Sequence, residues 1–267
     1  MGDLKPQDRF RPALQAVGDA VRFFTRLPLS PSAAAPLDFN RAAWAAPVAG
    51  AIVGLVGSAA LAFAWAIGLP QIMSAGLATA ALVATTGALH EDGLADAADG
   101  FGGGRTRERK LDIMRDSRIG AFGATALVLA LILRVGALAA ALEAGLSFAA
   151  GALILASAVS RAGALLPLAL LNPARRDGAG ASAGRLGGRA LIEACGAALL
   201  IALALGVFSV GVGHALSGVI GGAVGAAVMC ALARRHIGGQ TGDVAGAAQQ
   251  WAEIAAWCGL LIGRSLT

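Results

Sequence analysis

The chain alternates long apolar runs with short segments that hold nearly all of its charged residues. No charged residue occurs from Ala42 to Leu89, and this run is too long for one helix, since about 20 residues cross the hydrocarbon core. A turn at Pro70 divides it into two spans. The whole pattern predicts an all-α, polytopic integral membrane protein with six or seven transmembrane helices. The expected spans are 42–67, 72–90, 121–142, 148–171 and two within 194–233, followed by an apolar stretch at 244–262 that either spans or lies at the surface.

Composition supports a membrane protein. The mean hydropathy is +0.72 and charged residues make up 14%, against roughly 25% in soluble domains. So few charges could not cover the surface of a soluble fold of this size. The net charge of +5 is gathered between the apolar runs, which favours membrane lipids and phosphate-bearing substrates as partners and argues against nucleic acid.

The chain divides into two parts. Residues 1–41 have no signal-peptide pattern, and their apolar residues recur at helical spacing between arginines, which predicts an amphipathic helix on the membrane face. Residues 42–267 form the helical membrane domain. Four basic segments alternate with hairpins that lack Lys and Arg, so the positive-inside rule places all four in the cytoplasm: Lys5 to Arg41, Arg105 to Arg118, Arg175 to Arg189 and Arg234-Arg235. We expect the cytoplasmic loops 91–118, 172–189 and 234–243 to carry the functional residues.

The most informative segment is His90 to Gly100. Asp92, Asp96 and Asp99 are spaced i, i+4 and i+7, which places three carboxylates on one face of a helix. Like charges so arranged repel one another unless a divalent cation relieves them. Oxygen-only ligation suits Mg²⁺ or Mn²⁺ rather than Zn²⁺. A solvated acidic face is the alternative, but such faces usually mix signs.

Other polar groups could serve the same site. Arg115 and Arg118 suit phosphate binding, and Asp116 between them offers one more oxygen to a metal. The Gly-rich loop from Gly238 to Asp243 suits a phosphate site, although a turn with an N-cap explains it nearly as well.

Three further polar residues stand at or within apolar spans. Arg134 and Arg161 are costly in lipid and should face the protein interior, where they either pair with carboxylates or touch an anionic substrate. His90 suits a general base or a metal neighbour, with a capping or packing role as the alternative.

Taken together, these segments resemble the cobalamin synthase family, the adenosylcobinamide-GDP ribazoletransferases. The combination is far more specific than any single segment and spans most of the chain. The matching segments, in family order, are Phe24 to Pro28, His90 to Gly100, Met114 to Arg118, Ser160-Arg161, and Gly238 to Asp243 with Gly246-Ala247.

The resemblance implies a phosphotransferase that joins adenosylcobinamide-GDP to α-ribazole or its 5′-phosphate and releases GMP in cobalamin biosynthesis. It implies Mg²⁺ as the cofactor and an active site on the cytoplasmic face of the bacterial inner membrane. Self-association into a homo-oligomer is left open. The implied roles are: metal ligands Asp92, Asp96, Asp99 and Asp116; catalytic groups His90, Arg115, Arg118 and Arg161; substrate contacts Arg26, Gly239, Gln240, Thr241 and Asp243.

Two alternatives remain at this stage. A CDP-alcohol-type membrane phosphotransferase would pair its Asp-Gly with Ala-Arg two residues later, where Ala95-Asp96 stands here. A divalent-cation transporter would use the same carboxylates but would place them near the bilayer midplane rather than at one edge.

Overall fold

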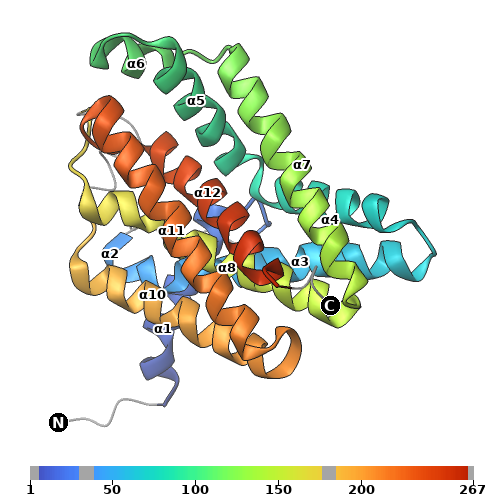
Figure 1. The fold of residues 1–267 in the computed structure, drawn as a ribbon. Coiled ribbons are helices and arrows are strands. Elements are labelled where there is room, and N and C mark those ends of the chain that lie inside the picture. The colour runs from blue at the N-terminus through green and yellow to red at the C-terminus, as the bar shows by residue number, and fades with distance from the viewer. Residues whose placement is uncertain (1–5, 30–38, 176–184, 264–267) are drawn as a thin grey trace, which may run out of the picture.

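A computed structural model describes residues 6–29, 39–175 and 185–263, and every regular element in these ranges is helical (Figure 1). The all-α class expected from the sequence is confirmed. In chain order the elements are α1 Pro6–Phe24, α2 Phe39–Ala42, the 3₁₀ turn η1 Ala43–Ala45, α3 Ala46–Ala66, α4 Gln71–Thr86, α5 Leu89–Gly103, α6 Arg107–Ile113, α7 Ala121–Glu143, α8 Leu146–Leu170, α10 Gly188–Leu205, the π-helical turn η2 Gly206–Val210, α11 Val212–Ile237 and α12 Gly242–Leu261.

The polytopic architecture is also confirmed. Five helices in the described ranges are long and apolar enough to cross a membrane, and the bent pair α4–α5 raises the number to six if it counts as one span. These five are Asn40–Ala66, Ala121–Glu143, Leu146–Leu170, Gly188–Val210 and Val212–Ile237.

Two helices form the centre of the domain. In the most apolar 18-residue stretch of α8, 83% is buried inside the protein, against 28% in α7 and 22% in the span that contains α10. The second central helix, α12, packs against α11, α8 and α5 (Figure 1). The peripheral helices therefore turn leucine and isoleucine side chains such as Ile132 and Leu200 outward, as a lipid surface allows.

A buried polar network joins α5, α7, α8 and α12. Arg134 on α7 pairs with Glu91 at 2.7 Å and with Glu253 at 3.0 Å, and Arg161 on α8 lies 3.8 Å from Glu253. Gln249 donates to Glu253 at 2.6 Å. The two arginines and two glutamates balance in charge, which explains how they are tolerated inside an apolar domain. The sequence expectation that both arginines face the interior is confirmed.

The turn between α4 and α5 determines where the acidic motif lies. The predicted span 72–90 ends early, because α4 stops at Thr86 and the chain bends by 89° into α5. Gly87 and Ala88 both adopt left-handed backbone conformations, at φ 65° and 59°. Such a φ is uncommon for alanine and is found more often at functional turns. The segment 91–118 is therefore not an open loop, since α5 and α6 occupy most of it.

The predicted N-terminal helix is present as α1, but part of its apolar face packs on protein. Ala16, Ala20 and Val21 are buried, and α1 contacts α3. Leu14 remains 70% exposed. The C-terminal part of α1 therefore belongs to the domain, and it brings the next residues, through Leu29, toward the turn between α4 and α5.

Hydrogen bonds link the basic segments to one another, or to residues directly beside them. Arg107 on α6 donates hydrogen bonds to the carbonyls of Ile237, at the end of α11, and Ala174, after α8. The N–H of Gly187, before α10, donates to the Asn40 side chain at 2.7 Å. These contacts agree with the predicted placement of the basic segments on one side. Of the predicted loop 172–189, residues 176–184 lie outside the described ranges.

Candidate active site

Asp92 and Asp96 lie on the same face of α5. Asp92 is exposed and Asp96 is half-buried. Neither side chain has a hydrogen bond or ion pair with the described residues, although Asp96 lies within electrostatic range of Asp92, Asp99, Asp243 and Arg175. The structure thus brings two unpaired carboxylates together as the i, i+4 spacing predicted.

Close packing of α5 on α12 adds a third carboxylate. A Cβ built on Gly93 would lie 2.8 Å from the Asp243 carbonyl oxygen and 3.1 Å from the Cα of Gly246. Only a glycine lets the two backbones approach this closely. Asp243, in the first turn of α12, consequently lies near Asp92 and Asp96.

The Asp243 carboxylate is held by two neighbours. Arg175 Nη2 donates to its Oδ2 at 3.2 Å, and the Thr241 hydroxyl donates to the same oxygen at 3.1 Å. Burial raises the pKa of the Asp243 carboxyl, and the charge of Asp92 adds to that rise. The positive charge of Arg175 and the hydrogen bonds from Thr241 and Arg175 partly offset it. Arg175 Nη1 is buried and has no partner within the described residues.

The Gly-rich loop before α12 is built largely by backbone pairing. Gln240 N–H donates to the Asn172 carbonyl at 2.9 Å, and Ala174 N–H donates to the Gln240 carbonyl at 2.8 Å. A Cβ on Gly239 would meet the Asn172 carbonyl. Thr241 caps α12 by accepting from Val244 N–H at 3.2 Å. The turn-and-cap interpretation therefore holds for Gly239, Gln240 and Thr241, and of the expected substrate contacts in this loop only Asp243 reaches a cavity.

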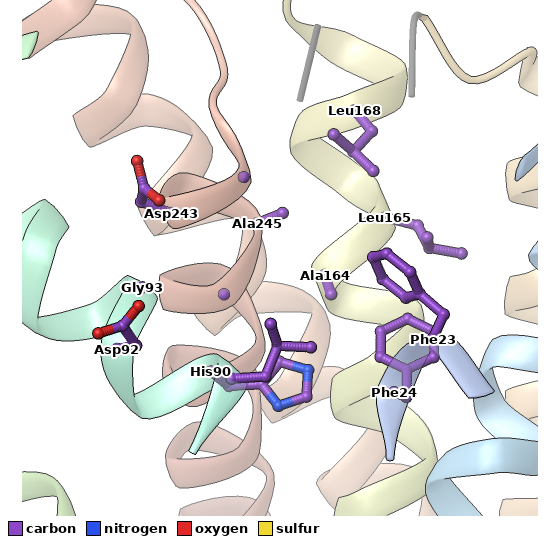
Figure 2. Close-up of a pocket in the computed structure, with 13 residues that line it drawn as sticks. Phe23, Phe24, His90, Asp92, Gly93, Ala164, Leu165, Leu168, Asp243 and Ala245 are labelled. Carbon is purple, nitrogen blue, oxygen red and sulfur yellow. The ribbon is translucent and has the colours of Figure 1, made fainter. Parts of the chain in front are cut away.

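Two cavities meet at the acidic motif. The first, of about 150 Å³, is mainly apolar and lies between the end of α1, α8, α5 and the start of α12 (Figure 2). The second, of about 460 Å³, is more polar and lies over the turn between α4 and α5. Both are lined by Phe23, Leu89 and Asp92.

Arg26, one of the substrate contacts predicted from the sequence, lines the second cavity. Its backbone N–H donates to the Thr85 carbonyl at 2.8 Å, and its side chain lies over Gly87. A Cβ on Gly87 would overlap the Arg26 guanidinium, so the glycine at this turn is needed for space as well as for its positive φ. Arg26 and Asp92 thus share the walls of one cavity.

Asp99 does not join the other carboxylates. It is buried, and its two oxygens accept hydrogen bonds from the backbone N–H groups of Gly120 at 2.7 Å and Gly123 at 2.8 Å. N–H groups at the start of a helix have no acceptor within that helix, so Asp99, from α5, serves as an N-cap for α7. Helical spacing alone could not distinguish this partner from a metal.

Arg115, Asp116 and Arg118 lie beyond α6 and line neither cavity. Arg118 pairs with Asp116 at 2.6 Å, with side chains 87% and 39% exposed. The Arg118 hydrogen bonds lower the pKa of Asp116 to about 2. The set of four metal carboxylates expected from the sequence is therefore not assembled: Asp99 caps α7 and Asp116 is paired with its neighbour.

His90 lines a cavity, whereas Arg161 does not line either of the two cavities. His90 lines the first cavity, is 3% exposed and stacks on Phe24, with ring centroids 5.8 Å apart and planes at 12°. Its Nε2 has no partner within the described residues. Arg161 is 2% exposed and belongs to the Glu253 network, and it lines neither cavity.

The donor set still fits Mg²⁺. No three His, Cys, Asp or Glu side chains converge on a metal position within the described residues. Mg²⁺ bound for phosphate chemistry, however, needs only one or two carboxylates, with water and substrate phosphates completing its shell. Asp92 and Asp96 are two such oxygen donors, and neither side chain forms an ion pair or hydrogen bond with the described residues.

Comparison with known proteins decides the family. The model of a protein family described as cobalamin-5-phosphate synthase matches residues 16–261 of the chain. The chain belongs to the cobalamin-5-phosphate synthase family. Similar proteins named adenosylcobinamide-GDP ribazoletransferase occur in Azorhizobium caulinodans, at 51% identity over 93% of this chain and 96% of that protein, and in Xanthobacter autotrophicus, at 50% over 91% and 94%. One from Bradyrhizobium diazoefficiens is 48% identical over 88% of each chain. No solved structure matches.

The family expected from the sequence motifs is thereby confirmed, together with a transferase of cobalamin biosynthesis, and the two alternative classes are not supported. Sequence reasoning missed several groups: Glu91, to which it gave no role, Arg175, and the glutamines of α12. The apolar spacing around Phe23 and Phe24 was visible, but it indicated only an amphipathic helix.

Proposed function

We propose that this chain transfers the phosphocobinamide group of adenosylcobinamide-GDP to α-ribazole or its 5′-phosphate. The 3′-hydroxyl oxygen of the ribazole attacks the phosphorus nearest the cobinamide, the bond to GMP breaks, and the hydroxyl proton is released. The products are adenosylcobalamin, or its 5′-phosphate, and GMP. The observation that carries the proposal is the meeting of two cavities at Asp92, beside Asp96 and Asp243.

Two substrates need two adjoining sites, and the reaction needs positive charge between them. Asp92 and Asp96 would hold Mg²⁺, which when bound would neutralise the diphosphate. Arg26 on the second cavity and Nη1 of Arg175, which has no partner among the described residues, are suited to donate to phosphate oxygens. Asp243 keeps Arg175 in place through their ion pair.

The remaining residues of the proposed site position these groups. Asp99 fixes α5 against α7, and the pair of Glu91 with Arg134 holds the first turn of α5 from the other side. His90 lines the cavity next to Asp92 with a free ring nitrogen, which suits it to accept the hydroxyl proton.

We also infer that the site faces the cytoplasm of a bacterial inner membrane. The basic residues near the contacts that join α6 to the end of α11, and the residue before α10 to α2, support this orientation through the positive-inside rule.

Purified protein in detergent, incubated with Mg²⁺, adenosylcobinamide-GDP and α-ribazole 5′-phosphate, should release GMP and form adenosylcobalamin 5′-phosphate. Omission of the ribazole and of Mg²⁺ are the two controls. Wild-type protein that is folded but releases no GMP with either ribazole would refute the proposal.

A further inference from the structure

The first cavity, of about 150 Å³, has an apolar wall and a polar end. Figure 2 shows Phe23, Phe24, Leu165 and Leu168 on one side, and the carboxylates of Asp92 and Asp243 on the other. His90 lies between the two sides (Figure 2). The occupant should therefore be a small apolar group that carries a polar substituent at one end.

The rings of the wall favour a flat aromatic occupant. Phe24 stacks on His90 with planes at 12°, and Phe23 meets Phe24 edge-on, at 89° and a centroid distance of 4.9 Å. A bound aromatic ring could thus make both stacked and edge-to-face contacts with these rings, the two arrangements that aromatic pairs prefer. His90 adds a buried ring nitrogen without a partner among the described residues. An apolar cavity of about 150 Å³ is known to be large enough for a benzene ring.

We propose that this cavity is the subsite for the aromatic base of the ribazole, with the ribose directed toward Asp92 and Asp243. The inference rests on the proposed function and assigns its two substrates to the two cavities. The benzimidazole base of a ribazole is apolar and flat, and its ribose hydroxyls supply the polar end. A corrin ring is far too large for this cavity.

The second cavity, which Arg26 lines, suits the diphosphate of the other substrate. Its volume is about 460 Å³, and it combines Arg26 with Thr25 and Thr86. The Thr25 and Thr86 hydroxyls donate to the backbone carbonyls of Val21 and Leu82, so the Arg26 guanidinium is the group suited to donate to phosphate here. A lipid acyl chain is the rival occupant of the apolar cavity, but it has no polar atom to offer the unpartnered Nε2 of the described His90 side chain.

Phe23 gives the first test, since it lines the cavity and is 39% exposed, so its truncation should not unfold the protein. Phe23→Ala should weaken binding of α-ribazole to the metal-free protein, measured by calorimetry without the corrinoid, by about tenfold, while Phe23→Trp retains binding. Phe63→Ala, which removes a 68% exposed phenyl ring from α3, is the matched control and should change nothing. Because Phe23 also lines the second cavity, the KM for adenosylcobinamide-GDP is measured in Ala164→Val, whose residue lines the first cavity and not the second, and it should stay within about twofold.

Ala164 gives a second test of base specificity, because it lines the cavity from α8. Ala164→Val should lower kcat/KM for the ribazole with a dimethylated base about tenfold more than for the ribazole with an unsubstituted base, since a pocket discriminates by single methyl groups. The selectivity ratio is independent of the amount of folded enzyme, so partial misfolding cannot mimic this result.

These experiments distinguish failure of the proposed subsite from failure of the proposed function. Unchanged ribazole binding in Phe23→Ala, or in Ala164→Val a raised KM for adenosylcobinamide-GDP with unchanged ribazole selectivity, would overturn the subsite while GMP release by the wild type upheld the function. Loss of copurified lipid from Phe23→Ala without any effect on ribazole would identify a lipid groove and would equally overturn it. Failure of the wild type to release GMP would refute the proposed function itself.

Discussion

The carboxylate of Asp99 on α5 accepts a 2.8 Å hydrogen bond from the backbone N–H of Gly123 in the first turn of α7. Its other oxygen accepts from Gly120 N–H at 2.7 Å. One side chain thus caps a transmembrane helix from a neighbouring element. The contact fixes α5, and with it Asp92 and Asp96, relative to the membrane domain.

This cap predicts that Asp99→Asn destabilises the protein without changing its metal requirement. An amide has one acceptor oxygen, so one of the two N–H groups loses its partner, at a cost of about 1–2 kcal/mol. We expect a lower Tm and an unchanged Mg²⁺ concentration for half-maximal GMP release. A large rise in that concentration at an unchanged Tm would instead make Asp99 a metal ligand.

Asp92→Asn and Asp96→Asn should act in the opposite way. Each removes an unpaired carboxylate, so the Mg²⁺ concentration for half-maximal activity should rise by about tenfold or more. Metal-free stability should hold or improve, because like-charge repulsion on α5 falls. Asp116→Asn, outside both cavities, is the control and should leave the Mg²⁺ titration unchanged. A near-normal titration for Asp96→Asn would remove Asp96 from the proposed site.

Glu253→Gln should be strongly destabilising. The change breaks the pair with Arg134 and leaves Arg161 without its nearest carboxylate, and an uncompensated buried charge costs about 3–5 kcal/mol. Thermal unfolding in detergent measures the effect. Glu193→Gln, which breaks an exposed pair with Arg189, is the matched control and should change stability by at most about 0.5 kcal/mol. Equal Tm values for the two variants would contradict the charge balance proposed for the network.

Gly93→Ala tests the contact that brings Asp243 to the acidic motif. The new methyl group would meet the Asp243 carbonyl at 2.8 Å and force α5 away from α12. We expect a loss of stability of about 1–3 kcal/mol and a marked fall in GMP release. Gly136→Ala on α7, which has open space around it, should be neutral or slightly stabilising. Full activity in Gly93→Ala would show that this close approach is not required.

Cysteine labelling tests the orientation. In a background without Cys195, Cys230 and Cys258, Glu108→Cys and Arg235→Cys should resist an impermeant thiol reagent added to intact cells. Glu143→Cys, at the C-terminal end of α7, and Gly213→Cys, at the N-terminal end of α11, should react. All four residues are exposed, so accessibility within the protein does not differ between the sets. Labelling of Glu108→Cys in intact cells would reverse the orientation.

Several features followed from the sequence because they depend on local pattern. The absence of charge from Ala42 to Leu89 identified the apolar runs, and the spacing of Asp92 and Asp96 placed them on one helical face. The bend after Thr86 did not follow, because Ala88 gives no signal that it adopts a positive φ. Arg134 and Arg161 were expected inside, yet their partner Glu253 lies about 100 residues away in sequence.

The sequence by itself determined that this protein is an all-helical membrane protein and, through its motifs, which family it belongs to. Hydrophobic runs and helical periodicity are properties of neighbouring residues, so they can be read without a fold. Only the tertiary structure decided which carboxylates share a site. Asp92, Asp96 and Asp99 look equivalent along α5, but the packing of α7 gives Asp99 two N–H donors. The packing of α12 through Gly93 brings Asp243 beside the other two, because contacts between distant segments depend on backbone approach that no local pattern encodes.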